Sequence, residues 1–225
     1  MKTRSYLIIL AFTLILILLL SCQEATVNPW LNPTNKISDF PNEIGNEWTY
    51  CNEDSVLSSK DTVIIRITGD TLLPNNHSAK IWQTLGIRAG IEYVMDTTFI
   101  WIVNDTVFSS GPYKSGYYDD AIQEILYVFP LNTEKIWNQI KYRNSPLKDV
   151  YLDTVEIKTI NILVSPAGRF NTYSICYYPS LYTNFVGNRF VDFALGIGEV
   201  RFQLLDSFNV PVYTYYLINY KLVNK

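Results

Sequence analysis

The chain combines one long apolar run near its amino end with many short runs in which apolar and polar residues interchange. The long run, residues 6–20, follows the cations Lys2 and Arg4. Its 15 residues fall short of the roughly 20 that a helix needs to cross a hydrocarbon core. The preceding cations orient such a segment during export, because they stay on the inner side of the membrane. The pattern predicts a cleaved export signal, which takes no part in the fold.

The short runs predict β-strands. Val, Ile, Thr and aromatic residues fill them and turn residues separate them, as is typical of strands on a half-buried sheet. Thr62–Thr68 and Lys80–Gly86 should form a hairpin, because a turn at residues 74–76 lies between them. The other predicted strands are Ile91–Met95, Thr98–Val103, Ile136–Tyr142, Val155–Val164, Phe170–Tyr178, Phe190–Leu195, Glu199–Leu205 and Val212–Val223.

These runs predict a mainly β single domain of ten to thirteen strands in an antiparallel meander. We expect a curved, largely antiparallel sheet, either an open half-barrel or sandwich-like, with at most one or two short helices. Asp119–Phe129 is ambiguous, because its apolar residues are spaced as in a helix while Ile125–Phe129 also suits a strand. We therefore expect a short helix or turn that runs into a strand there.

Strand periodicity also predicts which faces the C-terminal tyrosines occupy. Tyr213 and Tyr215 should share one face of their strand, and Tyr216 and Tyr220 the other. These rings either fill a core or offer an aromatic face to a ligand or partner.

Ser21 and Cys22 end the export signal in a pattern, Leu19-Leu20-Ser21-Cys22, that resembles the lipobox of bacterial lipoproteins. The resemblance implies cleavage before Cys22, which would then carry a diacylglycerol and an acylated amino group. Several acyl chains hold a protein on a membrane far more firmly than one. Asp is absent from the position after Cys22, where Gln23 stands, and this favours the outer membrane. The domain could face the periplasm or the outside.

The predicted organisation has three parts. Residues 1–21 are the signal peptide, 22–39 are the lipidated N-terminus with an Asn- and Pro-rich tether, and 40–225 are the globular domain. Without Lys2 and Arg4 the chain has 16 basic and 21 acidic residues, a net charge of −5. No basic stripe is present in the sequence, so a nucleic-acid partner is not expected.

Three further patterns resemble a broad group of uncharacterised bacterial lipoproteins. They are Phe40–Tyr50 as "FP…GN.W.Y", residues 166–175 as "PAG.F.TY.I", and Gly196–Phe202 as "G.G.V.F". The resemblance implies an open, strongly curved sheet like that of periplasmic lipoprotein carriers, and it brings no catalytic residues. Phe40-Pro41 before Trp48 is echoed by Phe129-Pro130 before Trp137 at the same spacing, either by duplication or by chance.

Groups that carry catalysis or hold metals are sparse. His77 is the only histidine and lies in a turn-like segment, where we expect a solvated loop residue, so a Ser-His-Asp triad or a multi-histidine metal site is not expected. No cofactor is expected. Cys51 and Cys176 either form a disulfide, which an exported protein permits, or are small buried residues of strands.

Carboxylates are the remaining route to catalysis. Asp119 and Asp120 follow an aromatic loop that could stack on a sugar, but we interpret them as a surface loop with a helix-start signal and keep catalysis as the alternative. Spacing identifies no partner for Glu43, Glu47, Asp192 or Glu199. We expect a non-enzymatic membrane-tethered module for a hydrophobic ligand or an envelope protein; the alternative is a carboxylate-dependent glycan hydrolase.

Overall fold

A computed structural model describes residues 35–52, 61–73, 76–88, 90–111, 124–142, 150–179 and 187–223. These residues contain twelve strands and one short 3₁₀ helix, η2 (Ile37–Asp39). The strands are β1 (Glu47–Asn52), β2 (Thr62–Leu72), β3 (Ser78–Arg88), β4 (Ile91–Val103), β5 (Thr106–Ser110), β6 (Glu124–Val128), β7 (Ile136–Tyr142), β8 (Val150–Ser165), β9 (Gly168–Tyr178), β10 (Arg189–Ala194), β11 (Gly198–Leu205) and β12 (Pro211–Lys221).

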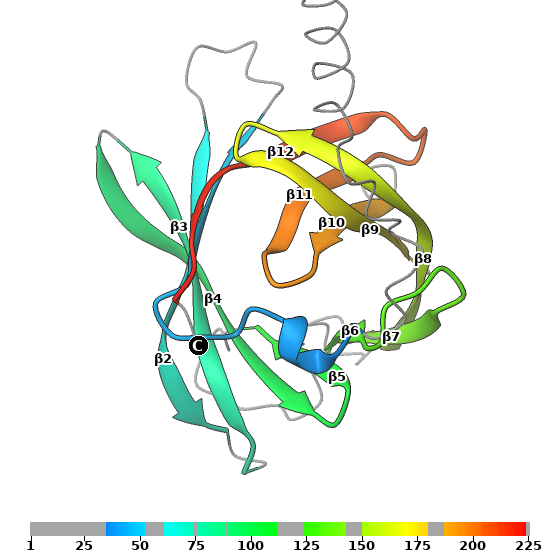
Figure 1. Ribbon diagram of the computed structural model, residues 1–225, viewed down its shortest axis with the longest axis horizontal. Helices are drawn as coiled ribbons and strands as arrows, with labels where there is room; N and C mark the ends of the chain where they lie inside the picture. The colour runs from blue at the N-terminus through cyan, green and yellow to red at the C-terminus, as the bar shows by residue number, and fades with distance from the viewer. Residues whose placement is uncertain are drawn as a thin grey trace, which may run out of the picture. The chain divides into compact units, whose positions relative to one another are not determined.

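All the described strands belong to one antiparallel sheet in the order β6-β5-β4-β3-β2-β1-β12-β11-β10-β9-β8-β7. Each half of the chain forms a six-strand meander, and the two halves join where β1 pairs with β12. Figure 1 shows the strands curling around a common interior. The predicted antiparallel curved sheet is confirmed, in its half-barrel form, because one sheet curls on itself in place of two packed sheets.

The curl brings the edge strands β6 and β7 together through side chains. Trp137 Nε1 donates to the carbonyl of Ile125 at 3.2 Å, and Gln139 Nε2 donates to Glu124 Oε2 at 3.0 Å. A closed sheet has no exposed edge that could pair with another chain. Side chains therefore complete a nearly closed, barrel-like wall.

The predicted strands agree with the structure, and the main differences lie in the first half of the sheet. The runs at 91–95 and 98–103 are one strand, β4, with a bulge where Asp96 pairs with Thr84 but Val94 pairs with Leu85. The sequence analysis missed β5, which is short and follows a tight turn at Asn104 (φ 52°). The strand alternative for 124–128 is confirmed as β6. The residues of the alternative helix before it, 119–123, lie outside the described residues.

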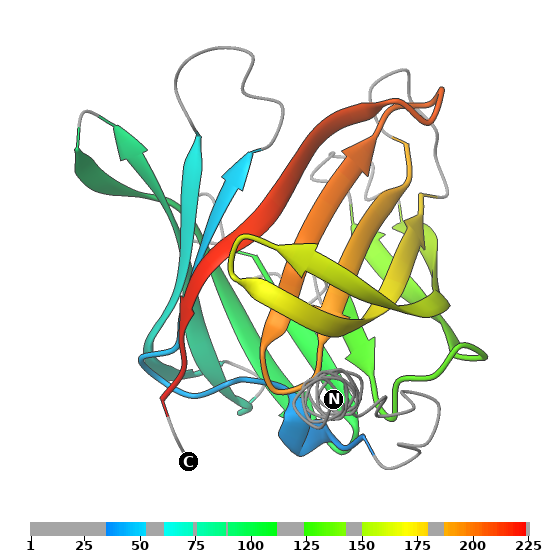
Figure 2. The same ribbon diagram turned by 45° about the horizontal axis from the view of Figure 1, so that its top comes forward.

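A segment that we name the strap, residues 35–46, crosses the end of the sheet at which the β10–β11 turn lies (Figure 2). Asn35 is buried; its Nδ2 donates to the carbonyl of Leu131 at 2.7 Å, and its Oδ1 accepts from the Leu131 N–H. Farther along, Gly196 N donates to the Asp39 carbonyl at 2.7 Å, and Val223 N donates to Asn46 Oδ1 at 2.7 Å. The strap thereby connects both halves of the sheet.

Two apolar clusters fill the interior. The larger is built on β4–β10 and the strap, and it includes Phe40, Tyr127, Phe193 and Ile175. The second joins β1, β2, β11 and β12 to the bent β8–β9 hairpin, whose Phe170 contacts the ring of Tyr220 at 6.1 Å. Within the described part of the chain, no helix has the length and apolar character needed to cross a bilayer.

The C-terminal tyrosines show how a bulge changes a face prediction. Tyr213 and Tyr215 share a face as predicted, with ring centroids 5.7 Å apart. The prediction for Tyr220 was wrong, because the β1–β12 register shifts so that Leu217 pairs with Tyr50 and Tyr220 with Trp48. Partners in an antiparallel pair share a face, so Tyr220 lies on the inner side and not with Tyr216.

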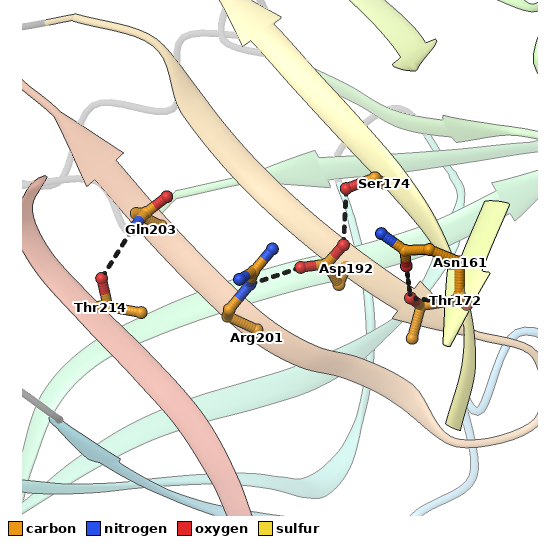
Figure 3. A network of polar contacts seen from close by, with 7 residues as sticks. All are labelled: Asn161, Thr172, Ser174, Asp192, Arg201, Gln203 and Thr214. Carbon is orange, nitrogen blue, oxygen red and sulfur yellow. Dashed lines mark hydrogen bonds and ion pairs between the residues drawn. The ribbon is translucent and has the colours of Figure 1, made fainter. Parts of the chain in front are cut away.

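On the outer face of the sheet, opposite the apolar interior, a row of polar side chains crosses β9–β11 (Figure 3). Asp192 is completely buried; it accepts from Ser174 Oγ at 2.6 Å and forms an ion pair with Arg201. Ser174 and Arg201 are its direct partners on the two neighbouring strands. The register of three strands therefore assembles this network, and Asp192 has the partner that sequence spacing did not reveal.

Replacing Asp192 tests the value of this pair. Asp192→Asn should lower the free energy of unfolding by about 3 kcal/mol, since the half-buried Arg201 loses its counterion. The control Asp70→Asn breaks an exposed pair with Lys80 and should cost less than about 1 kcal/mol. Urea unfolding of both variants measures the difference; equal costs would contradict a structural role for the Asp192 pair.

A second pair of variants tests the close approach of the β10–β11 turn to β1. Gly198 has φ +108°, and a Cβ there would lie 3.3 Å from Trp48 Nε1 and from Pro41 Cγ. Gly90 also has positive φ, but a Cβ there would meet nothing within 4 Å. Gly90→Ala should cost about 1 kcal/mol from backbone strain alone. Gly198→Ala should cost at least about 1 kcal/mol more in the same unfolding assay.

Candidate aromatic binding pocket

A cavity of about 90 Å³ lies on the inner side of the sheet, next to the strap. Among the described residues, six aromatic side chains dominate its wall, with aliphatic residues between them and one carboxylate, Glu199. The lining residues are Phe40, Pro41, Trp48, Tyr50, Ile65, Trp82, Ile100, Leu126, Tyr127, Phe193, Gly198 and Glu199. They come from the strap, β1–β4, β6, β10 and β11, so only the curled sheet brings them together.

Phe40 of the strap forms the floor of the pocket. Its ring stacks on Trp82 at 5.9 Å and on Phe193 at 6.1 Å, with interplanar angles of 22° and 7°. The same ring contacts Tyr127 at 5.8 Å. Phe40 is 4% exposed, so the floor is packed as tightly as a core.

The two indoles of the wall are held in place by hydrogen bonds. Trp48 and Trp82 stack at 5.1 Å with an interplanar angle of 11°. Trp48 Nε1 donates to the Ile197 carbonyl at 2.6 Å, and Trp82 Nε1 donates to Asn42 Oδ1 at 2.9 Å. Both indole donors are therefore satisfied by the protein, which leaves the rings as apolar wall.

Glu199 is held by two tyrosines. Tyr127 donates its hydroxyl to Glu199 Oε1 at 2.6 Å, and Tyr50 donates to the Glu199 backbone carbonyl at 2.9 Å. Burial raises the pKa of both tyrosines well above the ordinary value, and the charge of Glu199 raises it further. Both hydroxyls thus stay protonated and act as donors at physiological pH.

Arg189 lies on the same inner face, outside the pocket wall. Its guanidinium carbon lies 4.0 Å from the ring centroid of Tyr177. Burial raises the pKa of Tyr177 to about 12, although the Arg189 charge opposes the shift. Arg189 Nε is buried and has no hydrogen-bond partner among the described residues. Burial lowers the pKa of Arg189, but Tyr177 and the charge of Glu199 more than offset that effect, so the ring face and Glu199 both stabilise the cation.

Of the predicted site residues, two lie away from this pocket and the others lie outside the described residues. Ser21, Cys22, Asp119 and Asp120 lie outside the described residues. Cys51 on β1 and Cys176 on β9 are free thiols. Three strands lie between β1 and β9 in the sheet, whereas a disulfide requires Cα atoms within about 7 Å.

The remaining candidate groups have structural surroundings. His77 lies in the β2–β3 turn, half-buried, with its ring 6.2 Å from that of Trp101. Glu47 pairs with Arg66 at 2.6 Å. Across the described residues, no three His, Cys, Asp or Glu side chains gather in a way that could hold a metal ion.

The arrangement suits binding better than hydrolysis. Glycoside hydrolysis uses two carboxyl groups across a cleft, and the wall of this pocket contains one. Apolar rings around a single polar group are typical of ligand sites. The sequence analysis missed the pocket, although two of its patterned segments supplied part of the wall: Phe40, Pro41, Trp48 and Tyr50 from the first, and Gly198 and Glu199 from the last.

No protein-family model matches the chain, and no curated protein sequence matches it. Among solved structures, a Bacteroides fragilis protein assigned as exported, with a YmcC-like fold, is 16% identical over 81% of this chain and 98% of its own, with a TM-score of 0.44. A Parabacteroides distasonis protein assigned as a lipoprotein is 13% identical over 81% of this chain and 98% of its own, at TM-score 0.43. A chain of the Pseudomonas aeruginosa MucA/MucB complex is 12% identical over 85% of this chain and 55% of its own, at TM-score 0.37.

Proposed function

We propose that this protein is a lipid-anchored module of the bacterial envelope that binds a hydrophobic ligand in the aromatic pocket, without catalysing a reaction. The observation that carries the proposal is the cavity of about 90 Å³ walled by six aromatic residues. A well-packed core leaves few voids larger than a water molecule. A cavity of this size in the interior is therefore a candidate site for an apolar guest.

The distribution of burial supports the proposal. Trp48, Tyr50, Tyr127 and Phe193 are each at most 2% exposed, so packing holds these parts of the wall rigid. Ile65, Trp82 and Leu126 are only half-buried and keep surface that a ligand can cover. Covering apolar surface contributes about 0.8 kcal/mol per methylene group, and a rigid wall avoids the entropy cost of ordering side chains on binding.

The anchor is the second part of the proposal. The pattern that ends in Cys22 supports lipidation, and the Asn- and Pro-rich segment after it supports a tether. In this arrangement the acyl chains hold the protein at the outer membrane, where hydrophobic molecules of the envelope are concentrated. The tether would join the domain at the strap, which forms the pocket floor.

Chain-length dependence tests the pocket. In a series of n-alkanols from methanol to heptanol, each added methylene should tighten binding about fourfold until the pocket is full, after which the Kd should level off. Isothermal titration calorimetry measures the series. Ile65→Trp should fill the pocket and remove the dependence, while Ile162→Trp, at a position 49% exposed on β8, should leave it unchanged. Equal binding by both variants would exclude this site.

Replacement of Cys22 tests the anchor. Cys22→Ala should release the protein from the membrane fraction, because the acyl chains then have no attachment point. Fractionation followed by mass spectrometry of the mature N-terminus measures the effect. Cys51→Ala is the matched control and should remain membrane-bound with the lipid mass intact. Retention of Cys22→Ala on the membrane would contradict the lipidation.

A further inference from the structure

The described residues of the pocket wall include one formal charge. Eleven of these twelve residues are aromatic, aliphatic, proline or glycine, and the twelfth is Glu199. A carboxylate is expensive to remove from water unless it is paired or hydrogen-bonded. The position of Glu199 in this wall therefore bears on which chemical group of a ligand can lie next to it.

The donors of the wall are already in use. The indole N–H groups of Trp48 and Trp82 bond to a carbonyl and to an amide oxygen of the protein. The hydroxyls of Tyr50 and Tyr127 both donate to Glu199, one to its backbone and one to its carboxylate. The wall side chains therefore have no remaining donor for an anionic ligand.

The acceptors are not all in use. Tyr127 bonds to Oε1 of Glu199, and among the described residues no hydrogen bond reaches Oε2. Glu199 is only half-buried, so it keeps surface that a ligand can reach. Arg189 stacks on Tyr177 and does not line the cavity, although its charge interacts with that of Glu199. Among the described lining residues, the formal charge is therefore negative.

Aromatic faces favour the same kind of ligand. The quadrupole of Trp, Tyr and Phe rings attracts ammonium groups, and cages of such rings with a carboxylate recognise quaternary ammonium and amine ligands. Here the rings of Tyr50 and Tyr127 are tied to Glu199 itself. The Glu199 carboxylate and the two tyrosine side chains therefore lie next to one another in the wall.

We propose that the pocket selects ligands with an apolar chain that ends in a protonated amine or a quaternary ammonium, and that Glu199 is the residue that selects them. This inference rests on the proposed function, since it names the head group of the ligand that the apolar pocket binds. A purely structural role for Glu199, in which it only supports Tyr50 and Tyr127, is the competing explanation. The two explanations predict different effects of the ligand head group on affinity.

A head-group series at constant chain length tests the selection. Heptylammonium and heptyltrimethylammonium should bind at least about tenfold tighter than 1-heptanol, and heptanoate should bind weakest, because the carboxylate repels it. Calorimetric titrations of the wild-type protein at pH 7 give the four Kd values. Equal binding of cation and alcohol would overturn the inference while leaving the proposed function in place; no binding by any of the four would overturn the proposed function itself.

Glu199→Gln identifies the residue responsible. The amide keeps an oxygen that can accept from Tyr127 and removes the charge. Affinity for heptylammonium should fall about tenfold and affinity for heptanol should stay within about twofold. The matched control Glu47→Gln removes a carboxylate that pairs with Arg66 outside the pocket and should leave the head-group order unchanged. A Glu199→Gln protein that binds both heptyl ligands as the wild type does would contradict the role of Glu199; if that variant does not fold, the wild-type series alone decides.

Discussion

The contacts of one ring, Phe40, hold together the parts of the structure that enclose the pocket. This ring packs on Trp82 of β3, Tyr127 of β6 and Phe193 of β10. Those strands lie far apart in the order of the sheet. A curled sheet leaves the apolar inner side open at its ends, and water would enter there without a cover. The strap provides this cover at one end, and the ring of Phe40 is the apolar group that packs the strap against the interior.

Hydrogen bonds complete the same closure. Asn35 bonds to both backbone groups of Leu131, which follows the edge strand β6, and its Nδ2 also donates to Tyr173 Oη on β9 at 2.9 Å. The strap therefore spans the junction where β6 meets β7 through Trp137 and Gln139. Residues 35–39, which composition placed in the tether, take part in this contact. A ligand site and a tether would thus share one structural element.

Among the described residues that line the pocket, the side-chain donors are paired. Tyr50, Tyr127 and both pocket indoles give their hydrogens to protein acceptors. Such pairing is required because an unsatisfied buried group costs about 1–3 kcal/mol. Glu199 differs from these lining residues because it is charged and, among the described residues, its Oε2 accepts no hydrogen bond. The pocket is for this reason chemically asymmetric, apolar on most sides and acidic on one.

The sequence by itself determined the local structure. Alternating apolar residues and turn residues predicted the strands from β2 to β12 except β5. Only the tertiary structure decided the rest. A bulge moved Tyr220 to the inner face, strand register gave Asp192 its partner Arg201, and curling gathered twelve residues between Phe40 and Glu199 into one wall. Periodicity acts over a few residues, whereas pairing, register and closure depend on contacts between segments that are distant in the chain, and these are set by the packing of the whole sheet.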